Sequence, residues 1–468
     1  MRPPLPIQTL TEILYEEGNE MGYGIPASMK GAVVSAWPGG IGGIPATLAN
    51  GTPVKIPVLQ GVNVLTFGVV GTGKTGSYTL PAAECLLRAN PRMLGVFFEI
   101  KRSFIDHFLQ PGDKVITQDP GAVRPENLFR PNLIREIRQA ADREAEMRQL
   151  ADFLFGDLLQ DTMALAWIQS ARDAFIGILR VIVDLYPDQD TSNWELVNAL
   201  RQMSMEEILG YLARHPRNVS VLKKDFNYDP ACPTHYRPHR RAADILFFFN
   251  QVLEKFSGAF ESRGRDTISD YLAGKYGRNL FFLYDLASAE ISRPFMLYYL
   301  KKLKDFKMSN RKDQTPPLLL VLDEIDKMCD GGKTADFGLF QAVNLGREYG
   351  LQILLTSQSV ENLYGLSPDF NPHGTMGGLA GFPMVLSFRP GDPTTISTLQ
   401  TLFGSDYREH LVLPPSRYGS AERKLEREPL VTDQAFAGLD TGDCYVKIGA
   451  CPPQKVHILY PVQGGDAP

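Results

Sequence analysis

Residues 62–87 read VNVLTFGVVGTGKTGSYTLPAAECLL, and this stretch decides the fold. It opens with a short apolar run, residues 62–67, that suits a buried strand. Residues 68–75 follow and match the pattern GxxxxGK followed by Ser or Thr at every fixed position. A helix is predicted over residues 80–87, so the loop connects a strand to a helix N-terminus. A chance match in a glycine-rich turn is not expected to show this order, and we predict a phosphate-binding loop.

The residue types in this loop suit a nucleoside triphosphate. Gly68 and Gly73 allow backbone angles that a Cβ would forbid, so the loop can turn its N–H groups inward around a phosphate at the positive end of a helix dipole. Lys74 can reach the β- and γ-phosphates, and the Thr75 hydroxyl can ligate Mg²⁺. The predicted ATP-binding residues are Gly68, Gly71, Thr72, Gly73, Lys74 and Thr75.

The chain of 468 residues is too long for one ordinary core, so two or three domains are expected. Its net charge of −5 gives no whole-molecule attraction to nucleic acid, and any such contact must come from local basic patches. The five cysteines are odd in number and scattered, which favours a reducing compartment over a disulfide framework. No apolar run approaches the ~18 residues of a membrane span. We expect a cytoplasmic protein, or the soluble part of an assembly at the inner membrane.

Further strands alternate with helices after the loop. Residues 93–99 and 114–117 have the apolar character of short buried strands, and strands that alternate with helices imply a parallel sheet of βαβ units. Residues 1–60 are rich in Pro and Gly and contain short β-like runs. We interpret them as a small β-rich N-terminal region.

The character of the sequence changes near Pro131. Residues 133–213 show the periodicity of helices. Two apolar faces stand out, one made of Met147, Leu150, Phe153, Leu154 and Leu158, the other of Trp167, Ala171, Phe175 and Leu179. The simplest interpretation is a compact all-α domain inserted between two strands of the sheet. Long crossover helices are the alternative.

Residues 211–241 are locally basic, with seven basic and two acidic side chains, and Tyr228 and Tyr236 lie among them. Cationic groups beside aromatic rings suit contacts with single-stranded nucleic acid. The alternative is a solvated loop with ordinary surface charge. Cys232, His235 and His239 also lie here at spacings seen in zinc sites. A closed zinc site needs four ligands, however, and no second Cys or His pair lies near these three residues.

A second motif complements the phosphate-binding loop. Residues 318–322 are an apolar run that ends in Asp323 and Glu324. At the carboxyl end of a strand beside the loop, Asp323 can hold Mg²⁺ through water, and Glu324 can orient the attacking water and take its proton. A buried strand that runs into an acidic turn is the alternative, and the pairing with the loop disfavours it.

A third element follows over residues 346–358. Residues 351–357 form an apolar strand that delivers Gln358 to its carboxyl end, where ligands bind in open parallel sheets. There Gln358 can sense the γ-phosphate, or it can be an ordinary polar cap. Arg347 can stabilise charge on phosphate, in its own subunit or across an interface, or it can form a structural salt bridge. We predict Glu324, Arg347 and Gln358 as the catalytic residues.

Four stretches in this order resemble a known family. They are GTGKTGSYTLPAAECLL at 71–87, FFEIK at 97–101, LLLVLDEIDKM at 318–328 and GREYGLQILLTSQSVENLYG at 346–365. Together they resemble the coupling ATPases of type IV secretion, which belong with the RecA-like ring translocases. The resemblance runs over most of residues 60–460, and its most specific part is the stretch around Arg347 and Gln358.

The resemblance implies an ATP-hydrolysing, Mg²⁺-dependent motor that moves DNA through a homo-hexameric ring, with secretion or conjugation proteins as partners. It also implies a RecA-like α/β fold with a mostly parallel central sheet. We therefore expect a β-rich region at 1–60, a nucleotide-binding domain in two parts at 61–131 and 265–468, and an inserted all-α domain at 132–264.

Two features depart from the family pattern. Coupling proteins usually begin with membrane-spanning helices, which this chain does not show, and Glu99 stands where the family often has Asp. The chain can be a membrane-free relative, a fragment without its anchor, or a subunit that a partner recruits. Two alternatives to a DNA motor are a soluble ATPase that passes protein substrates to a secretion machine and a small-molecule kinase. The long helical separation of Lys74 from Asp323 disfavours the kinase.

Overall fold

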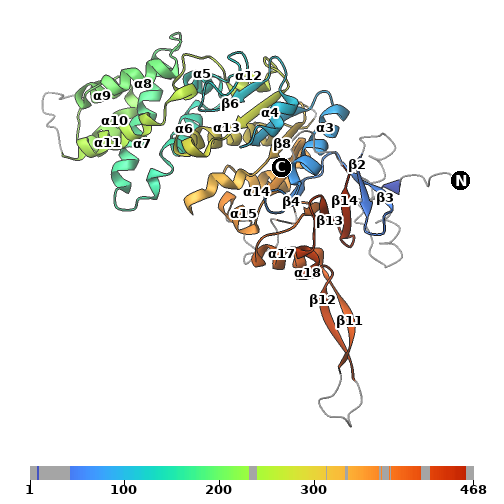
Figure 1. Cartoon of the computed structure of the whole chain (residues 1–468). Helices are drawn as coiled ribbons and strands as arrows, with labels where there is room; N and C mark the ends of the chain where they lie inside the picture. The colour runs from blue at the N-terminus through green and yellow to red at the C-terminus, as the bar shows by residue number, and fades with distance from the viewer. Residues whose placement is uncertain are drawn as a thin grey trace. The chain divides into compact units, whose positions relative to one another are not determined.

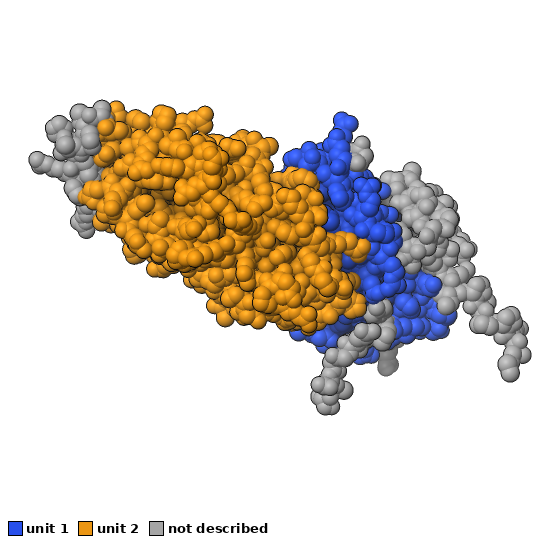
Figure 2. Space-filling view, turned by 90° about the horizontal axis from the view of Figure 1, so that it is seen from above, with its two compact units in different colours: residues 1–98, 307–468 blue, residues 99–306 orange. Residues whose placement is uncertain are grey.

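The structure is a computed structural model that describes residues 8–9, 43–230, 240–312, 314–332, 336–367, 370, 379, 381–412 and 422–459. The chain forms two compact units, which Figure 2 colours separately: residues 1–98 with 307–468, and residues 99–306. Figure 1 labels the helices and strands of both units. The trio of Cys232, His235 and His239, considered above for zinc, lies outside the described residues.

The first unit is built on a sheet whose central strands are parallel. Their order is β10 (Met384–Ser387), β4 (Val64–Phe67), β9 (Leu351–Ser357), β8 (Leu318–Leu322) and β5 (Leu94–Glu99). Almost all of their residues are buried, as expected for strands that are covered on both faces. The predicted α/β fold with a mostly parallel central sheet is therefore confirmed.

Beyond β10 the same sheet continues in antiparallel order. The added strands are β13 (Asp443–Ile448), β14 (Gln454–Ile458), β2 (Gly43–Leu48) and β3 (Pro53–Pro57), and β1 (Gln8–Thr9) then pairs in parallel with β3. Strands β1 to β3 come from the region predicted as β-rich, residues 1–60. They are hydrogen-bonded into the central sheet of their unit.

Short helices and one hairpin complete the first unit. The hairpin pairs β11 (Ser405–Val412) with β12 (Glu422–Pro429), and Figure 1 shows it extending away from the sheet of its unit. The helical elements are η2 (Lys74–Thr79), α3 (Leu80–Ala89), η8 (Ile325–Gly332), α14 (Leu339–Leu345), η9 (Gly346–Tyr349), α15 (Val360–Leu366), α17 (Pro393–Phe403) and α18 (Asp433–Ala437).

The second unit is mainly helical. Its two strands, β6 (Lys114–Ile116) and β7 (Asn279–Leu283), pair in parallel. Its helical elements are α4 (Ser103–Phe108), α5 (Leu133–Gln139), α6 (Arg143–Phe155), η3 (Leu158–Gln160), α7 (Leu165–Leu185), α8 (Asn193–Gln202), α9 (Met205–Leu212), η4 (Pro216–Asn218), α10 (Val219–Phe226), α11 (Arg240–Glu254), η6 (Gly258–Glu261), α12 (Ile268–Leu272), η7 (Leu286–Ser288) and α13 (Ala289–Ser309), which continues into the first unit.

Side-chain caps define where several of these helices begin. Ser192 starts α8 and Ser204 starts α9, and each exchanges hydrogen bonds with a glutamate three residues later, which satisfies donors that the helix cannot pair itself. The Glu99 carboxylate likewise accepts the backbone N–H groups of Phe104 (2.9 Å) and Ile105 (2.8 Å) at the start of α4. Glu99 therefore has a structural role in capping a helix.

Helix α7 forms the centre of the helical core. The Phe175 ring lies 6.0 Å from the rings of both Phe155 on α6 and Phe249 on α11. The predicted apolar face of α6 is largely correct, since Leu150 and Leu154 are buried. Phe153 is only half-buried, however, and Phe155 takes the inward position.

Helices α5 to α11 occupy residues 133–254, within the predicted insertion at 132–264. The compact unit that contains them is larger than this range, because it also includes α4, β6, β7 and most of α13. In the part of the chain that the structure describes, no helix is both long and apolar enough to cross a membrane.

A buried amide joins the start of β4 to β9. The Gln352 side chain is 2% exposed and makes three hydrogen bonds to the backbone. Its Oε1 accepts the Gly61 N–H (2.9 Å), and its Nε2 donates to the carbonyls of Leu59 (2.9 Å) and Val62 (2.9 Å). The strand that carries the phosphate-binding loop is thereby held in place at its amino end.

We expect Gln352→Leu to lower the free energy of unfolding by about 3 kcal/mol, because it leaves three buried backbone groups without a partner. Urea denaturation measures this change. Gln202→Leu is the matched control, since that amide donates only to Asn198 (3.2 Å) on the exposed face of α8, and an effect within about 0.5 kcal/mol is expected. Equal losses in the two variants would contradict the role given to Gln352.

Candidate nucleotide-binding site

The phosphate-binding loop follows β4 and requires glycine at two positions. Gly68 has φ 153° and Gly73 has φ 99°, values that favour glycine. A Cβ on Gly68 would also lie 2.8 Å from the Phe388 Cβ, and one on Gly73 would lie 2.7 Å from the Ser77 hydroxyl. Larger residues at either position would force the loop out of this path.

The loop is fixed by hydrogen bonds at both ends. The Val69 N–H donates to the Arg389 carbonyl (2.9 Å), and the Gly442 N–H donates to the Thr72 carbonyl (3.2 Å). The Thr72 hydroxyl donates to the Val69 carbonyl (2.8 Å), so its side chain stabilises the turn itself. Gly71, at the tip, has φ 81° and open space around it.

Lys74 and Thr75 begin the helical segment η2 after the loop. The Lys74 ammonium is buried and donates to the carbonyls of Gly68 and Val69, the latter at 3.0 Å, so its charge lies against the loop. The Thr75 hydroxyl lies 3.1 and 3.0 Å from the two carboxylate oxygens of Asp323. The first and second sequence motifs are therefore in direct contact.

Asp323 follows β8 and is held from two sides. Its carboxylate accepts hydrogen bonds from the hydroxyls of Thr75 and of Thr356 on β9. Burial raises the pKa of Asp323 above its usual value and the charge of Glu324 raises it further, whereas the two hydroxyls and the Lys74 ammonium lower it. A cation bound beside Asp323 would offset this unfavourable burial of charge.

Glu324 has a backbone conformation that is uncommon for a non-glycine residue, with φ 53°. Its N–H donates to the Thr356 hydroxyl (3.1 Å), which fixes the chain where it turns away from the end of β8. The residue is 8% exposed. Such local strain is found at sites where the surrounding structure determines the direction of a side chain.

Gln358 lies at the same edge of the sheet as the loop. In the parallel pair of β4 and β9, Phe67 is opposite Ser357, and the Gly68 N–H donates to the Ser357 carbonyl (3.3 Å). Gln358, the residue after β9, therefore follows the strand end beside Gly68. The structure thus brings the loop, Asp323 and Gln358 to the carboxyl ends of three adjacent strands.

Arg347 lies at the opposite edge. It belongs to η9, which precedes β9, and its side chain lies beside Gly61, which precedes β4. The seven residues of β9 span roughly 20 Å, so Arg347 cannot reach the loop of its own subunit. It is exposed, and it forms no ion pair with any residue that the structure describes. A catalytic role for Arg347 therefore stays a prediction, and it would concern the site of a neighbouring subunit.

Two polar residues near the site were not singled out from the sequence. Thr356 connects Asp323 with the Glu324 backbone. The signal available in the sequence was its polar side chain, next to Ser357, at the end of an otherwise apolar strand. Asp326 is 2% exposed; its Oδ2 accepts a hydrogen bond from Asn362 of α15 (2.6 Å), and its Oδ1 has no partner among the described residues. Asp326 therefore links the Asp323–Glu324 segment to the helix that follows Gln358.

The donor set at Thr75 and Asp323 fits Mg²⁺. Both residues offer oxygen atoms, which hard cations prefer, and a second carboxylate, Glu324, is the next residue. No group of three or more His, Cys, Asp or Glu in the described ranges could hold a metal ion by itself. Thr75 and Asp323 would therefore hold a cation only together with other ligands, such as phosphate oxygens.

The sheet order and the loop after β4 define a RecA-like P-loop fold. No protein-family model and no curated protein matches the chain. Solved structures do match it. The bacterial conjugative coupling protein TrwBdeltaN70, in an unbound monoclinic form, aligns with a TM-score of 0.63 and 18% identity over 89% of this chain and 88% of that chain.

Two further structures show the same likeness. The plasmid coupling protein TrwB in complex with the GTP analogue GDPNP has a TM-score of 0.62 and 16% identity over 89% of each chain. TrwB in complex with ADP and Mg²⁺ has a TM-score of 0.62 and 17% identity over 89% of this chain and 88% of that one. The resemblance to coupling proteins that the sequence motifs indicated is confirmed by these structures, which establish the fold at this level of identity.

The pKa of Asp326 gives a stability prediction that is independent of nucleotide. Burial raises this pKa from 3.8 to about 6, with Asn362 opposing the change. The folded state therefore binds the proton more tightly than the unfolded state, and stability falls as the pH rises from about 4 to about 6. We expect Asp326→Asn to be more stable than the wild type by about 3 kcal/mol above pH 7 and equally stable near pH 4.

Urea denaturation at pH 4 and pH 8 without nucleotide measures this difference. Asp188→Asn, at an exposed position after α7, is the control. Its difference from the wild type in free energy of unfolding should be the same at both pH values. A gain for Asp326→Asn that is the same at both pH values would show that the carboxyl group does not carry the pH dependence.

Proposed function

We propose that this protein is an ATP-hydrolysing motor of the conjugative coupling type, which moves DNA through a homo-hexameric ring. The observation that carries the proposal is the convergence of the phosphate-binding loop, Asp323 and Gln358 at one sheet edge in a chain with the TrwB fold. TrwB in complex with ADP and Mg²⁺, and in complex with the ATP analogue ADPNP, supports ATP and Mg²⁺ as the ligands.

In the proposed mechanism the loop N–H groups and Lys74 hold the phosphates of ATP. Thr75 and Asp323 would hold Mg²⁺, which when bound neutralises charge on the phosphate oxygens. Glu324 orients the attacking water and accepts its proton, and Gln358 senses the γ-phosphate by a hydrogen bond. Hydrolysis removes that hydrogen-bond partner, and Asp326 transmits the change to α15 through Asn362.

Arg347 completes the site of a neighbouring subunit in this proposal. Its position at the opposite edge from Lys74 suits a ring in which one subunit presents its loop edge to the arginine edge of the next. The planar guanidinium then stabilises charge on the departing phosphate. In the same proposal, residues 132–264 act as an inserted domain between the two nucleotide-binding parts, 61–131 and 265–468. The protein works in the cytoplasm, where conjugation or secretion proteins recruit it to the inner membrane.

A second candidate function is the transfer of protein substrates without DNA pumping. The basic stretch at 211–230 favours it, because several of its cationic side chains already contact other residues of the unit and are less available to the phosphates of DNA. Arg214 donates to the Tyr186 hydroxyl (2.8 Å) and stacks on a tyrosine ring, and Lys223 pairs with Asp229 at 3.6 Å. Residues 231–239 of the predicted stretch lie outside the described residues, and Arg240 and Arg241 begin α11.

ATP hydrolysis with and without single-stranded DNA tests the proposal. We expect Lys74→Ala to abolish nucleotide binding, and Glu324→Gln to bind ATP while hydrolysing it about 10²–10⁴-fold more slowly. A DNA motor should be stimulated by DNA, and added salt should reduce the stimulation strongly. Normal turnover by Glu324→Gln would remove that residue from the mechanism, and hydrolysis that ignores DNA would favour the second candidate function.

Mixing two inactive variants tests the position of Arg347. Arg347→Ala keeps an intact loop and Lys74→Ala keeps the arginine, so mixed rings should regain hydrolysis that neither variant shows alone. A mixture of Lys74→Ala with Asp323→Ala is the control, because both changes damage the same edge, and it should stay inactive. No recovery in rings that mass measurement shows to be mixed would exclude catalysis across the interface.

A further inference from the structure

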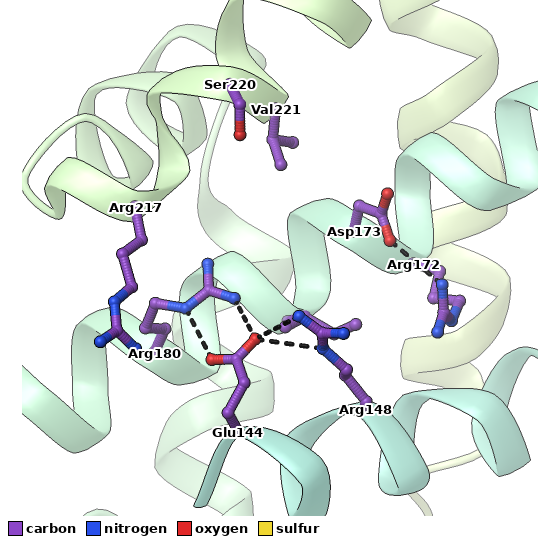
Figure 3. A pocket seen from close by; sticks show the side chains of 9 residues that line it. Glu144, Arg148, Arg172, Asp173, Arg180, Arg217, Ser220 and Val221 are labelled. Atoms are coloured by element: carbon purple, nitrogen blue, oxygen red, sulfur yellow. Dashed lines mark hydrogen bonds and ion pairs between the residues drawn. The ribbon is translucent and has the colours of Figure 1, made fainter.

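The helical unit contains an arginine-lined pocket that the nucleotide site does not use. The cavity, of about 500 Å³, lies between α6, α7, η4 and α10, all within residues 99–306. Figure 3 shows four arginines around it together with two carboxylates; they are Arg148, Arg172, Arg180, Arg217, Glu144 and Asp173. The lining therefore has an excess of positive charge.

The base of the pocket is an ion pair between a buried arginine, Arg180, and a half-buried glutamate, Glu144. Arg180 is 9% exposed in its side chain and donates to Glu144 twice, from Nε at 3.0 Å and from Nη2 at 2.6 Å. Its Nη1 donates to Asn218. These hydrogen bonds lower the pKa of Glu144, with the Arg180 bonds as the largest cause, so the pair remains ionised. Arg180 is thus held between Glu144 and Asn218, and it forms the floor of the pocket.

The rim arginines have donors that the internal contacts do not use. Arg148 is 62% exposed in its side chain and contacts Glu144 through Nε and Nη2, both at 3.2 Å. Arg217 is exposed, and its guanidinium has no hydrogen-bond or ion-pair partner among the described residues. Figure 3 shows the Arg217 side chain pointing toward the side of the pocket where Arg180 and Glu144 lie, with Ser220 at another side. The two rim guanidiniums can therefore take an anion from solvent.

The lining favours discrete carboxylates over a nucleic-acid strand. Arginine forks bind carboxylate and phosphate alike. No aromatic ring lines the pocket, so the bases of a nucleic-acid strand would have no stacking surface. Ile176 and Val221 supply apolar surface that suits the methylene groups of acidic side chains.

We propose that this pocket binds an acidic peptide segment of a partner protein, with Arg217 and Arg148 taking Asp or Glu carboxylates at the rim. The proposal concerns binding only and does not depend on ATP hydrolysis by the first unit. Ser220 is exposed and lines the pocket, so a substitution there changes the space open to a peptide.

Binding of a fluorescent hexaglutamate peptide to the full chain tests the proposal. We expect Arg217→Gln to weaken binding about tenfold, because it removes a charged donor that makes no contact within the fold. Arg265→Gln is the matched control: this arginine is 72% exposed in the same unit, outside the pocket, and its loss should leave binding unchanged. Ser220→Glu should abolish binding, because it places a fixed carboxylate in the pocket.

Several outcomes would overturn the proposal. The wild type would fail to bind hexaglutamate, or Arg217→Gln and Arg265→Gln would bind it equally well. A third such outcome is that Arg217→Gln still binds hexaglutamate but no longer binds a short single-stranded oligonucleotide. The last result would identify the pocket as a nucleic-acid contact. Lys74→Ala should bind hexaglutamate like the wild type, so a failure of the proposed ATPase mechanism would not be mistaken for a failure of this pocket.

Discussion

The parallel register of β4, β9 and β8 is the constraint on which the candidate site depends. Thr66 is opposite Thr356, and Leu322 is opposite Leu355, so the three strands end at the same edge. Asp323 then lies between a hydroxyl on η2 and a hydroxyl on β9. A slip of one residue in either pairing would turn every side chain of that strand to the other face and would separate these groups.

The same register places Arg347 away from the phosphate-binding loop of its own subunit. Parallel strands bring the residues that follow them to one edge and leave the residues that precede them at the other, which is where Arg347 lies. In the proposed mechanism a single chain therefore cannot assemble a complete catalytic set. Hydrolysis would depend on assembly, as expected for a ring motor in which each site is shared by two neighbours.

In both sites discussed for this protein, hydrogen bonds within the fold hold a buried charged side chain in place. Asp323 is fixed by two hydroxyls close to Lys74 and Glu324, and in the helical unit the Arg180–Glu144 pair fixes the floor beneath Arg148. Buried charges of this kind are tolerated because their hydrogen bonds are satisfied inside the fold. The hydrogen bonds cited for each arrangement lie within its own unit, so the two sites can be tested separately.

The sequence alone determined the phosphate-binding loop, the strands that end in Asp323 and Gln358, and the helical character of residues 133–213, because glycine angles, apolar runs and helical periodicity depend on near neighbours in the chain. The tertiary structure decided which face of α6 points inward at Phe155, that Thr356 joins the site, and that Arg347 lies at the far edge. It also decided that four arginines from three helical elements line one pocket. These features depend on strand order, register and helix packing between residues far apart in sequence. No local pattern specifies such contacts, so they could be established only once the chain was folded.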